Sequence, residues 1–188
     1  MARPQTIDDE DLLARLAEVF RDVGYAAASL SDLSAASGLQ RASLYHRFPG
    51  GKEQMAQEVL AAALARFSEK ILAPLAGGGT PAARLKIAAA NLDKYYASGR
   101  KSCLLNLFAA PGVEGGPFAP AIKSAFEALI AAFAALARED GRSAAQARRR
   151  AARAVMLLQG SLVLSRGLGK SDPFKSVLAD LPEDLLGE

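Results

Sequence analysis

The sequence predicts an all-α protein of about nine helices, in which an N-terminal three-helix module is joined to a larger C-terminal helical domain. Alanine is abundant and tryptophan is absent, a composition that suits a packed helical chain. Apolar residues recur three and four positions apart along most of the chain, and no stretch alternates apolar and polar residues as a half-buried strand would. At 188 residues the chain is also long enough to bury a substantial core.

The first predicted helix opens at Thr6 and Asp9, which have the spacing of a helix-capping pair. Apolar residues then recur at helical spacing as far as Val23. Gly24 is expected to end this helix, because glycine adopts the left-handed backbone of a helix terminus without steric cost. A helix of this length would pack across the next two helices and complete the three-helix module.

The next two helices are short and are separated by a glycine turn. Ser29 and Asp32 have capping-box spacing at the start of the first, and Gly38 is expected to end it. The buried side of the pair would be formed by Leu30, Leu33, Ala36, Leu39 and Leu44. The side chains left facing outward are Gln40, Arg41, Ser43, Tyr45, His46 and Arg47. This arrangement predicts a helix-turn-helix.

Charge is unevenly distributed along the chain. The formal net charge is +3, yet residues 1–60 carry six Lys/Arg against nine Asp/Glu, and residues 61–188 carry seventeen against eleven. From Leu33 to Lys52, however, there are three Lys/Arg, one His and no acidic residue. The outer face of the helix-turn-helix is therefore locally basic although its half of the chain is acidic.

A second basic run, Arg148-Arg149-Arg150 with Arg153, is the alternative candidate for a nucleic-acid patch. Three consecutive arginines on a helix point around most of its circumference, so they do not form one stripe. We therefore expect a solvated helix start at this run.

The rest of the chain is predicted to consist of further helices separated by proline, glycine and capping residues. A helix that begins near Lys52 is expected to run through Ile71 and to end at Pro74 and Gly77 to Gly79. The later helices are expected after the Thr80-Pro81 cap, over 103–109, over 118–140, over 143–167 with Ser143 and Gln146 as its capping pair, and after Asp172-Pro173. The helix over 143–167 is apolar on nearly all sides beyond Arg153, which indicates burial on more than one side.

The residue inventory argues against several classes of protein. No apolar run reaches the roughly 18–20 residues that a membrane span needs, and acidic residues at 8–11 stand where a signal peptide would have its apolar core. The single cysteine, Cys103, cannot form an internal disulfide, which favours a reducing cytoplasm. His46 is the only histidine, so no metal site and no Ser/His/Asp or Cys/His catalytic set can be assembled. We expect no enzyme activity, no cofactor and no membrane partner.

Several helix-turn-helix residues occur in a recurrent order: Ser29 leads the first helix, Ala35 to Gly38 forms an Ala-x-x-Gly turn, Leu44 to Phe48 reads Leu-Tyr-x-x-Phe, and Lys52 opens the next helix. In this order they resemble the DNA-binding region of the TetR family of bacterial transcriptional repressors. Ala42 stands where the family often has glycine, which should only stiffen the helix. The segment Phe-Pro-Gly-Gly-Lys resembles that of a subgroup with one extra residue before the lysine.

The resemblance implies a homodimer that presents two recognition helices to successive major grooves of a near-palindromic double-stranded operator DNA. Arg41 is the first candidate for reading bases, since a guanidinium can donate two hydrogen bonds to guanine. Tyr45 and Lys52 are expected to hold phosphates, as the matching positions do in the family. The remaining candidates for DNA contacts are Ser29, Gln40, Ser43 and His46. Core packing is the alternative role for Tyr45, and it is the favoured one for Phe48.

The resemblance also implies that the C-terminal domain binds a small effector, which we expect to be apolar or aromatic. Its candidate ligand-binding residues are Phe67, Asn91, Tyr95, Cys103, Phe108, Phe126, Phe133 and Gln159. Ordinary core packing is the alternative for each of them. Cys103 has a further alternative role as an oxidant- or electrophile-sensing thiol, as in some regulators of the family, although a lone cysteine in an apolar segment is more often inert.

The resulting hypothesis is a cytoplasmic, ligand-responsive repressor. Residues 1–50 would bind operator DNA, and residues 51–188 would bind the effector and form the dimer through the helices near 118–140 and 143–167. An effector that favours a conformation with mis-spaced recognition helices would release the DNA. Two alternatives remain open: a thiol-sensing regulator that uses Cys103, and a helical ligand-binding protein whose helix-turn-helix has no DNA function.

Overall fold

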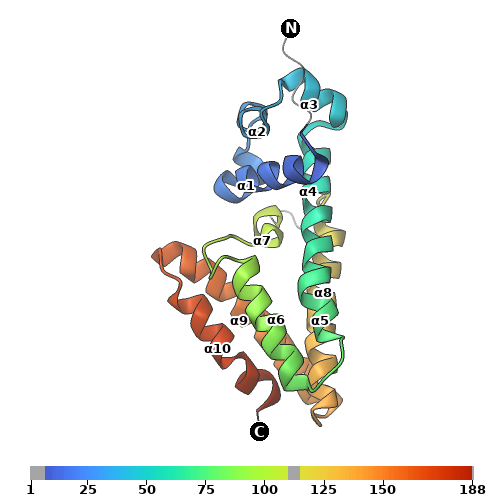
Figure 1. Ribbon diagram of the computed structural model, residues 1–188, viewed down its shortest axis with the longest axis vertical. Coiled ribbons are helices and arrows are strands. Elements are labelled where there is room, and N and C mark those ends of the chain that lie inside the picture. Colours follow the sequence, from blue (N-terminus) through green and yellow to red (C-terminus); the bar gives the residue numbers. More distant parts are fainter. Residues whose placement is uncertain (1–6, 110–114, 188) are drawn as a thin grey trace. The chain divides into compact units, whose positions relative to one another are not determined.

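The computed structural model describes residues 7–109 and 115–187, and every regular element within them is a helix. The prediction of an all-α protein is thus confirmed. The chain divides into two compact units, Met1–Leu64 with Leu104–Phe118 and Ala65–Cys103 with Ala119–Glu188. Figure 1 labels the helices of both units in chain order.

The first unit contains the helix-turn-helix. Its helices are α1 (Asp9–Ala27), α2 (Leu30–Ser37), α3 (Arg41–Arg47), most of α4 (Gly51–Phe67) and α7 (Leu104–Phe108). Helix α1 packs against both α2 and α7. The core that these helices enclose consists of Leu12, Leu16, Phe20, Leu33, Leu44, Phe48 and Met55, all almost fully buried. Burial of this apolar surface holds the short α2 and α3 in place, since helices of this length are marginal in isolation.

Both ends of α1 differ from the prediction. The helix begins at Asp9, and the carboxylate of Asp8 caps it by accepting from the N–H of Glu10 at 2.9 Å; Thr6 lies outside the described residues. Gly24 has a left-handed φ of 78° and kinks the helix, but the N–H of Ala28 still donates to the Gly24 carbonyl at 3.1 Å. The predicted end at Gly24 is therefore a kink, after which one more helical turn follows.

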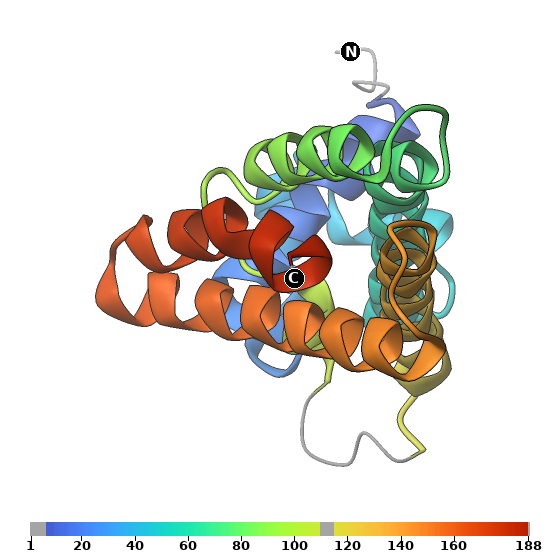
Figure 2. The ribbon, with the colours of Figure 1, turned by 90° about the horizontal axis from the view of Figure 1, so that it is seen from below.

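The second unit is built from the remaining helices: the end of α4, the π-helix η1 (Ser68–Leu72), α5 (Ala73–Leu75), α6 (Pro81–Tyr95), α8 (Ala119–Glu139), α9 (Ala144–Leu168) and α10 (Asp172–Leu186). Helix α9 packs against α8 and α10, and α10 also contacts α6, so that α10 lies between α9 and α6 (Figure 2). The predicted caps of α6 and α9 are confirmed, because Thr80 accepts from Ala83 and Ser143 forms a capping box with Gln146.

The predicted end at Pro74 and Gly77 to Gly79 is confirmed, because α5 ends at Leu75 with Ala76 as its cap, although Pro74 itself does not break the helix. Backbone angles stay helical from α4 through η1 into α5, and the wide turn lets the N–H of Ala73 donate to the Ser68 carbonyl, five residues back. Pro74 has no N–H for the carbonyl of Lys70, but the side chain of Asn91 on α6 donates to that oxygen at 2.8 Å. With α4, η1 and α5 counted as one rod, the described residues form nine helices, as predicted.

Helix α8 is the one helix in the described part of the chain that is long and apolar enough to cross a membrane by length and composition. Its apolarity comes largely from alanine, and one of its faces carries the buried Ile122, Leu129, Phe133 and Leu136. One such helix is weak evidence of a membrane span, and α8 packs against α9 within the second unit.

The compact units do not divide at residue 50, where the sequence suggested a functional boundary. Helix α4 begins at Gly51 and continues without a break, so most of its length packs with the helix-turn-helix up to Leu64. The segment Leu104–Phe118, which is distant in sequence, joins the same unit because α7 packs on α1. The functional division at residue 50 stays a prediction.

Candidate nucleic-acid interface

The two short helices are held in place by local hydrogen bonds. Ser29 and Asp32 form a complete capping box: Ser29 N–H donates to the Asp32 carboxylate at 3.1 Å, and Asp32 N–H donates to Ser29 Oγ at 3.2 Å. The Ser29 hydroxyl also donates to the Asp32 carboxylate at 2.7 Å, and this bond, followed by the one from the Ser29 N–H, lowers the pKa of the Asp32 carboxyl. At the other end of α2, Gly38 takes a left-handed φ of 73°, and Ser34 Oγ donates to the Leu39 carbonyl at 2.6 Å. The turn therefore has the geometry that the sequence predicted.

Helix α3 separates its apolar residues from its polar ones. Leu44 and Phe48 have exposed fractions of 0% and anchor the helix in the core of the first unit. The exposed side chains on and next to α3 include Gln40, Arg41, Ser43, Tyr45 and His46. The favoured core role of Phe48 is thus confirmed, and another molecule can reach the five exposed residues.

Arg41 lies at the start of α3 and is oriented by α2. Its Nη2 donates to Ser31 Oγ. Ser31 is exposed on the first turn of α2, and sequence reasoning overlooked it because a serine there carries no distinctive spacing. A guanidinium has five N–H donors, so this one bond leaves Arg41 further donors for a ligand.

Arg47 does not face outward as predicted. Its guanidinium pairs with Asp9 on α1 at 3.2 Å and with Glu58 on α4 at 3.0 Å, and it stacks on the ring of Phe48 at 4.6 Å. The hydrogen bonds from the guanidinium to Asp9 and Glu58 raise the pKa of Arg47. The sequence placed Arg47 on the polar side of α3, but only the tertiary structure brings the two carboxylates to it. Arg47 ties three helices together instead of contributing free positive charge.

Lys52 is also engaged within the first unit. Its ammonium donates to the carbonyls of Tyr25, Ala26 and Ala28 at 2.9, 3.2 and 3.0 Å, and it lies 4.8 Å from the centre of the Tyr25 ring. The phosphate contact that the sequence suggested for Lys52 stays a prediction. The contacts that the structure shows are with the C-terminal end of α1.

Tyr45 is 47% exposed, and its ring lies near the start of α4, where a Cβ on Gly51 would be 3.8 Å from the ring edge. The core-packing alternative for Tyr45 is therefore not what the structure shows. A half-exposed ring at the N-terminal end of α4 leaves its hydroxyl accessible.

The predicted effector residues are only partly brought together. The rings of Phe67 and Tyr95 meet edge to face with centroids 5.5 Å apart. The side-chain amide of Asn91 donates a hydrogen bond to the Lys70 carbonyl. Phe108 lies in the other unit, with its ring 5.4 Å from that of Phe20 and 4.9 Å from that of Phe118. Its contribution is to the packing of α7 on α1.

The other four candidates lie in the second unit. Phe133 is fully buried in the core, whereas Phe126 and Gln159 are half-buried on α8 and α9. Cys103 is buried, and the hydroxyl of Tyr96 donates to its Sγ at 3.6 Å. A common pocket for these residues stays a prediction.

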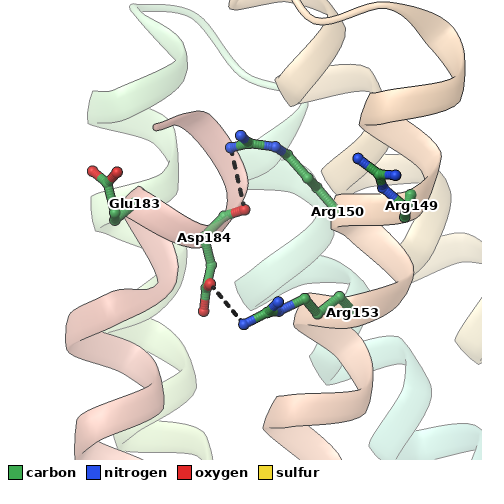
Figure 3. A pocket seen from close by; sticks show the side chains of 5 residues that line it. All are labelled: Arg149, Arg150, Arg153, Glu183 and Asp184. Atoms are coloured by element: carbon green, nitrogen blue, oxygen red, sulfur yellow. Dashed lines mark hydrogen bonds and ion pairs between the residues drawn. The ribbon is translucent and has the colours of Figure 1, made fainter. Parts of the chain in front are cut away.

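Some arginines of the second basic run contact α10, whereas the sequence predicted a solvated helix start. A cleft between α9 and α10 is lined by Arg149, Arg150, Arg153, Glu183 and Asp184, and Figure 3 shows Arg150 and Arg153 reaching Asp184. Arg150 donates to the carbonyls of Asp184 and Gly187, and Arg153 pairs with the Asp184 carboxylate at 3.5 Å. Cations placed on the last carbonyls of a helix satisfy groups that the helix itself leaves unpaired. The run therefore fastens α10 to α9.

Within residues 7–109 and 115–187, no three His, Cys, Asp or Glu side chains are close enough to hold a metal ion.

Residues 12–59, which contain this helix-turn-helix, match the family described as "Bacterial regulatory proteins, tetR family". The HTH-type transcriptional regulator LmrA of Bacillus subtilis (strain 168) is 23% identical over 177 residues, which cover 93% of this chain and 94% of that protein. A TetR transcriptional regulator from Legionella pneumophila has a crystal structure with a TM-score of 0.82 and 20% identity, over 97% of this chain and 100% of that one.

A cysteine mutant of the TetR family transcriptional regulator CifR, complexed with 26-bp double-strand operator DNA, is 24% identical with a TM-score of 0.74. The alignment covers 97% of this chain and 98% of that one. The matched family region coincides with the helix-turn-helix, and these relatives are regulators of transcription rather than enzymes. The helix-turn-helix region of this chain is therefore that of the bacterial regulatory proteins of the tetR family, and the chain along its length is similar to transcriptional regulators of that family.

Proposed function

We propose that this regulator acts in the cytoplasm as a homodimer, binds double-stranded operator DNA through the outer face of α3, and releases the DNA when a small apolar effector binds the second unit. The observation that carries the proposal is the exposed polar surface of α3 on a buried apolar base, described above. An α-helix fits the major groove of B-DNA, where base edges offer distinct hydrogen-bonding patterns.

Arg41 is the side chain on which we expect sequence reading to depend most. Arg47 and Lys52 have their charges engaged by Asp9, Glu58 and backbone carbonyls, so they are less available to DNA. Arg41 keeps donors free and stands at the N-terminal end of α3, the end of a recognition helix that reaches base edges. The further contacts to bases and phosphates that we propose are made by Gln40, Ser43, Tyr45 and His46, with Ser29 at the start of α2.

The exposed face of α9 supports the homodimer. Met156, Val163, Leu164 and Leu168 follow one another at helical spacing and are between 50% and 66% exposed. Gly160 and Gly167 lie between them, and a Cβ built on either glycine meets no other atom within 4 Å. A contiguous exposed apolar stripe marks an interaction surface, and the glycines leave room for a second helix to approach closely. Two-fold pairing there, together with α8, would give the dimer two copies of α3, one for each half of a near-palindromic operator.

An effector would act by binding one conformation of the dimer better than the other. It can shift the equilibrium only by its differential affinity, and a preference of about 150-fold corresponds to roughly 3 kcal/mol of coupling. The contact between the Phe67 and Tyr95 rings supports an aromatic or apolar effector, because it supplies an apolar surface in the second unit.

The proposal is tested by a gel-shift titration of the DNA upstream of this protein's own gene with the wild type, Arg41→Ala and Arg149→Ala. The two variants lose the same charge, but Arg149 lies on α9 and its substitution should leave binding unchanged. Arg41→Ala should cost about 1–3 kcal/mol, or roughly 5- to 150-fold in affinity. Equal losses in both variants would contradict recognition through α3. If no complex forms, the protein is used to select duplexes from a random library, and failure to enrich any sequence refutes operator binding.

The dimer is tested separately by light scattering of the purified protein. The wild type should have twice the 19.7 kDa mass of one chain, and Leu164→Glu should reduce this mass, because it places two charges in the paired stripe. Ala90→Glu on the exposed side of α6, outside the proposed interface, is the control for the added charge. A wild-type mass of one chain, or a dimer insensitive to Leu164→Glu, would rule out pairing through α9.

The contacts of Cys103 do not favour the thiol-sensing alternative. Its side chain is 4% exposed and accepts a hydrogen bond from Tyr96, and a buried thiol is chemically inert compared with an exposed thiolate. Peroxide should therefore leave DNA binding by the wild type and by Cys103→Ser equally unaffected. Release of DNA by peroxide from the wild type alone would establish the sensor.

A further inference from the structure

The cleft between α9 and α10 has a volume of about 400 Å³, and its α9 wall carries three arginines. Arg153 is four positions from Arg149 and three positions from Arg150, so these side chains are neighbours on one face of α9. Arg148 is exposed and does not line the cleft, since the helical repeat turns it away from this face. The α9 wall of the cleft is therefore basic.

The acidic groups of α10 do not neutralise this wall in full. The carboxylate of Asp184 pairs with Arg153 at 3.5 Å. Glu183 lines the cleft but forms no ion pair with any arginine in the described part of the chain. The carbonyls of Asp184 and Gly187 accept from Nη1 of Arg150 and carry no full charge. Three guanidinium groups against two carboxylates leave the cleft positively charged.

Two of the arginines have N–H donors without a partner. Arg149 is exposed and forms no hydrogen bond or ion pair within residues 7–109 and 115–187. Arg150 is half-buried and uses only Nη1, so its Nη2 and Nε groups have no partner within the same residues. A guanidinium has five N–H donors and no acceptor. A ligand that satisfies these two side chains must therefore accept hydrogen bonds.

Charge and size together define the class of ligand. Like charges at this helical spacing destabilise a helix, and an anion between them turns the repulsion into attraction. The planar guanidinium matches carboxylate and phosphate groups, with which it forms two parallel hydrogen bonds. Sites for small molecules have volumes of roughly 300–1,000 Å³, and this cleft lies near the lower end of that range. The cleft therefore fits a small oxyanion.

We propose that this cleft is a second ligand site, which binds a small molecule through a carboxylate or phosphate group held by Arg149 and Arg150, while Arg153 adds to the positive charge. The site shares no residue with the apolar effector candidates in the same unit. Its arginines also lie outside the helix-turn-helix and take no part in the proposed operator surface. The proposal therefore stands or falls independently of operator binding.

The first test is isothermal titration calorimetry of the wild-type protein with two probes, inorganic phosphate and malonate. The buffer contains no other oxyanion, and chloride keeps the ionic strength constant because screening alone would change the attraction. At least one probe should bind saturably with a Kd of about 1 mM or lower, and the tighter of the two identifies the preferred group. The absence of saturable binding by both probes would overturn the proposal.

A pair of matched variants locates the bound probe. Arg149→Gln removes a charge without breaking any contact within the described residues, so it should fold as the wild type does. It should weaken binding by about tenfold or more, because hydrogen bonds to charged groups are strong. Arg148→Gln loses the same charge one position away and should change the affinity by less than about twofold. Equal weakening in both variants would mean that the probe is attracted to the basic helix in general, which contradicts a site in the cleft.

A second pair of variants predicts the opposite sign. Glu183→Gln removes a like charge from the lining and should tighten binding by about two- to fivefold. Asp172→Asn removes an exposed carboxylate at the other end of α10 and should leave the affinity unchanged. The same affinity in Glu183→Gln as in the wild type, or equal gains in the two variants, would show that the anion does not lie beside Glu183.

Discussion

Replacing Asn91 by alanine removes the side chain that occupies the carbonyl released by Pro74. The sequence suggested Asn91 as an effector contact, but its Nδ2 donates to the oxygen of Lys70 at 2.8 Å. Proline lacks the N–H that would otherwise reach back four residues to this oxygen. Asn91→Ala therefore tests whether the amide has a structural role in joining α6 to the rod of α4, η1 and α5.

The expected loss of stability is about 1 kcal/mol. A neutral side chain-to-backbone hydrogen bond contributes roughly 0.5–1.5 kcal/mol, and a fully buried orphan carbonyl costs more. Asn91 is only half-buried, so water can reach the Lys70 oxygen in the variant and keep the loss within this range. A loss of this size lowers the melting temperature by about 2–4 °C for a chain of this length.

The assay is urea unfolding followed by circular dichroism at one fixed protomer concentration, because dissociation of a dimer would contribute to apparent stability. Asn91→Ala is also made in the Pro74→Ala variant, because alanine at position 74 restores an N–H that can donate to the Lys70 carbonyl. In that background, Asn91→Ala should cost clearly less than in the wild type, which gives a coupling energy of about 0.5–1 kcal/mol. The reasoning is refuted if Asn91→Ala costs nothing in the wild type, or costs the same in both backgrounds.

Three further results are expected. Arg47→Ala should lower the free energy of unfolding by about 1 kcal/mol, because its pairs with Asp9 and Glu58 are only partly shielded from solvent; an effect no larger than that of Arg149→Ala would argue against a structural ion-pair network. Gly38→Ala should cost about 1 kcal/mol through the left-handed φ alone, since a Cβ there meets no atom within 4 Å, and Gly38→Asn should cost less; similar losses for both would point to a different cause. The pKa of Asp32 is lower in the folded state than in the unfolded one, so its contribution to stability is present above the ordinary carboxyl pKa and is lost as pH falls through the folded value. Between about pH 5 and pH 3, the wild type should therefore lose more stability in urea titrations than Asp32→Asn does, and parallel pH profiles would contradict this.

Local sequence was sufficient for the elements that local chemistry specifies. The Ser29–Asp32 cap, the left-handed Gly38, and the caps at Thr80 and Ser143 depend on residues within a few positions of one another. Their geometry therefore follows from spacing alone. For the same reason the helical spacing of apolar residues placed Leu44 inside the fold correctly.

Local sequence was not sufficient where the partner was distant in the chain. Pro74 ends a helix unless another group accepts its orphan carbonyl, and Asn91 reaches that carbonyl from 21 positions away. Phe108 lies in the first unit because its helix, α7, packs on α1, and the spacing of apolar residues cannot indicate that contact. Both cases are tertiary packing prevailing over a local rule.

The sequence by itself determined the helical class, the helix-turn-helix, its glycine turn and the residues of its outer face, because helix caps and a 3.6-residue period act over short range. Only the tertiary structure decided which cationic side chains on or near that face are available to bind another molecule. Arg41 keeps donors free, Arg47 is taken by two carboxylates, and Lys52 is taken by the end of α1. The physical reason is that the availability of a charge depends on the groups that folding brings within a few ångströms, and those groups come from three different helices.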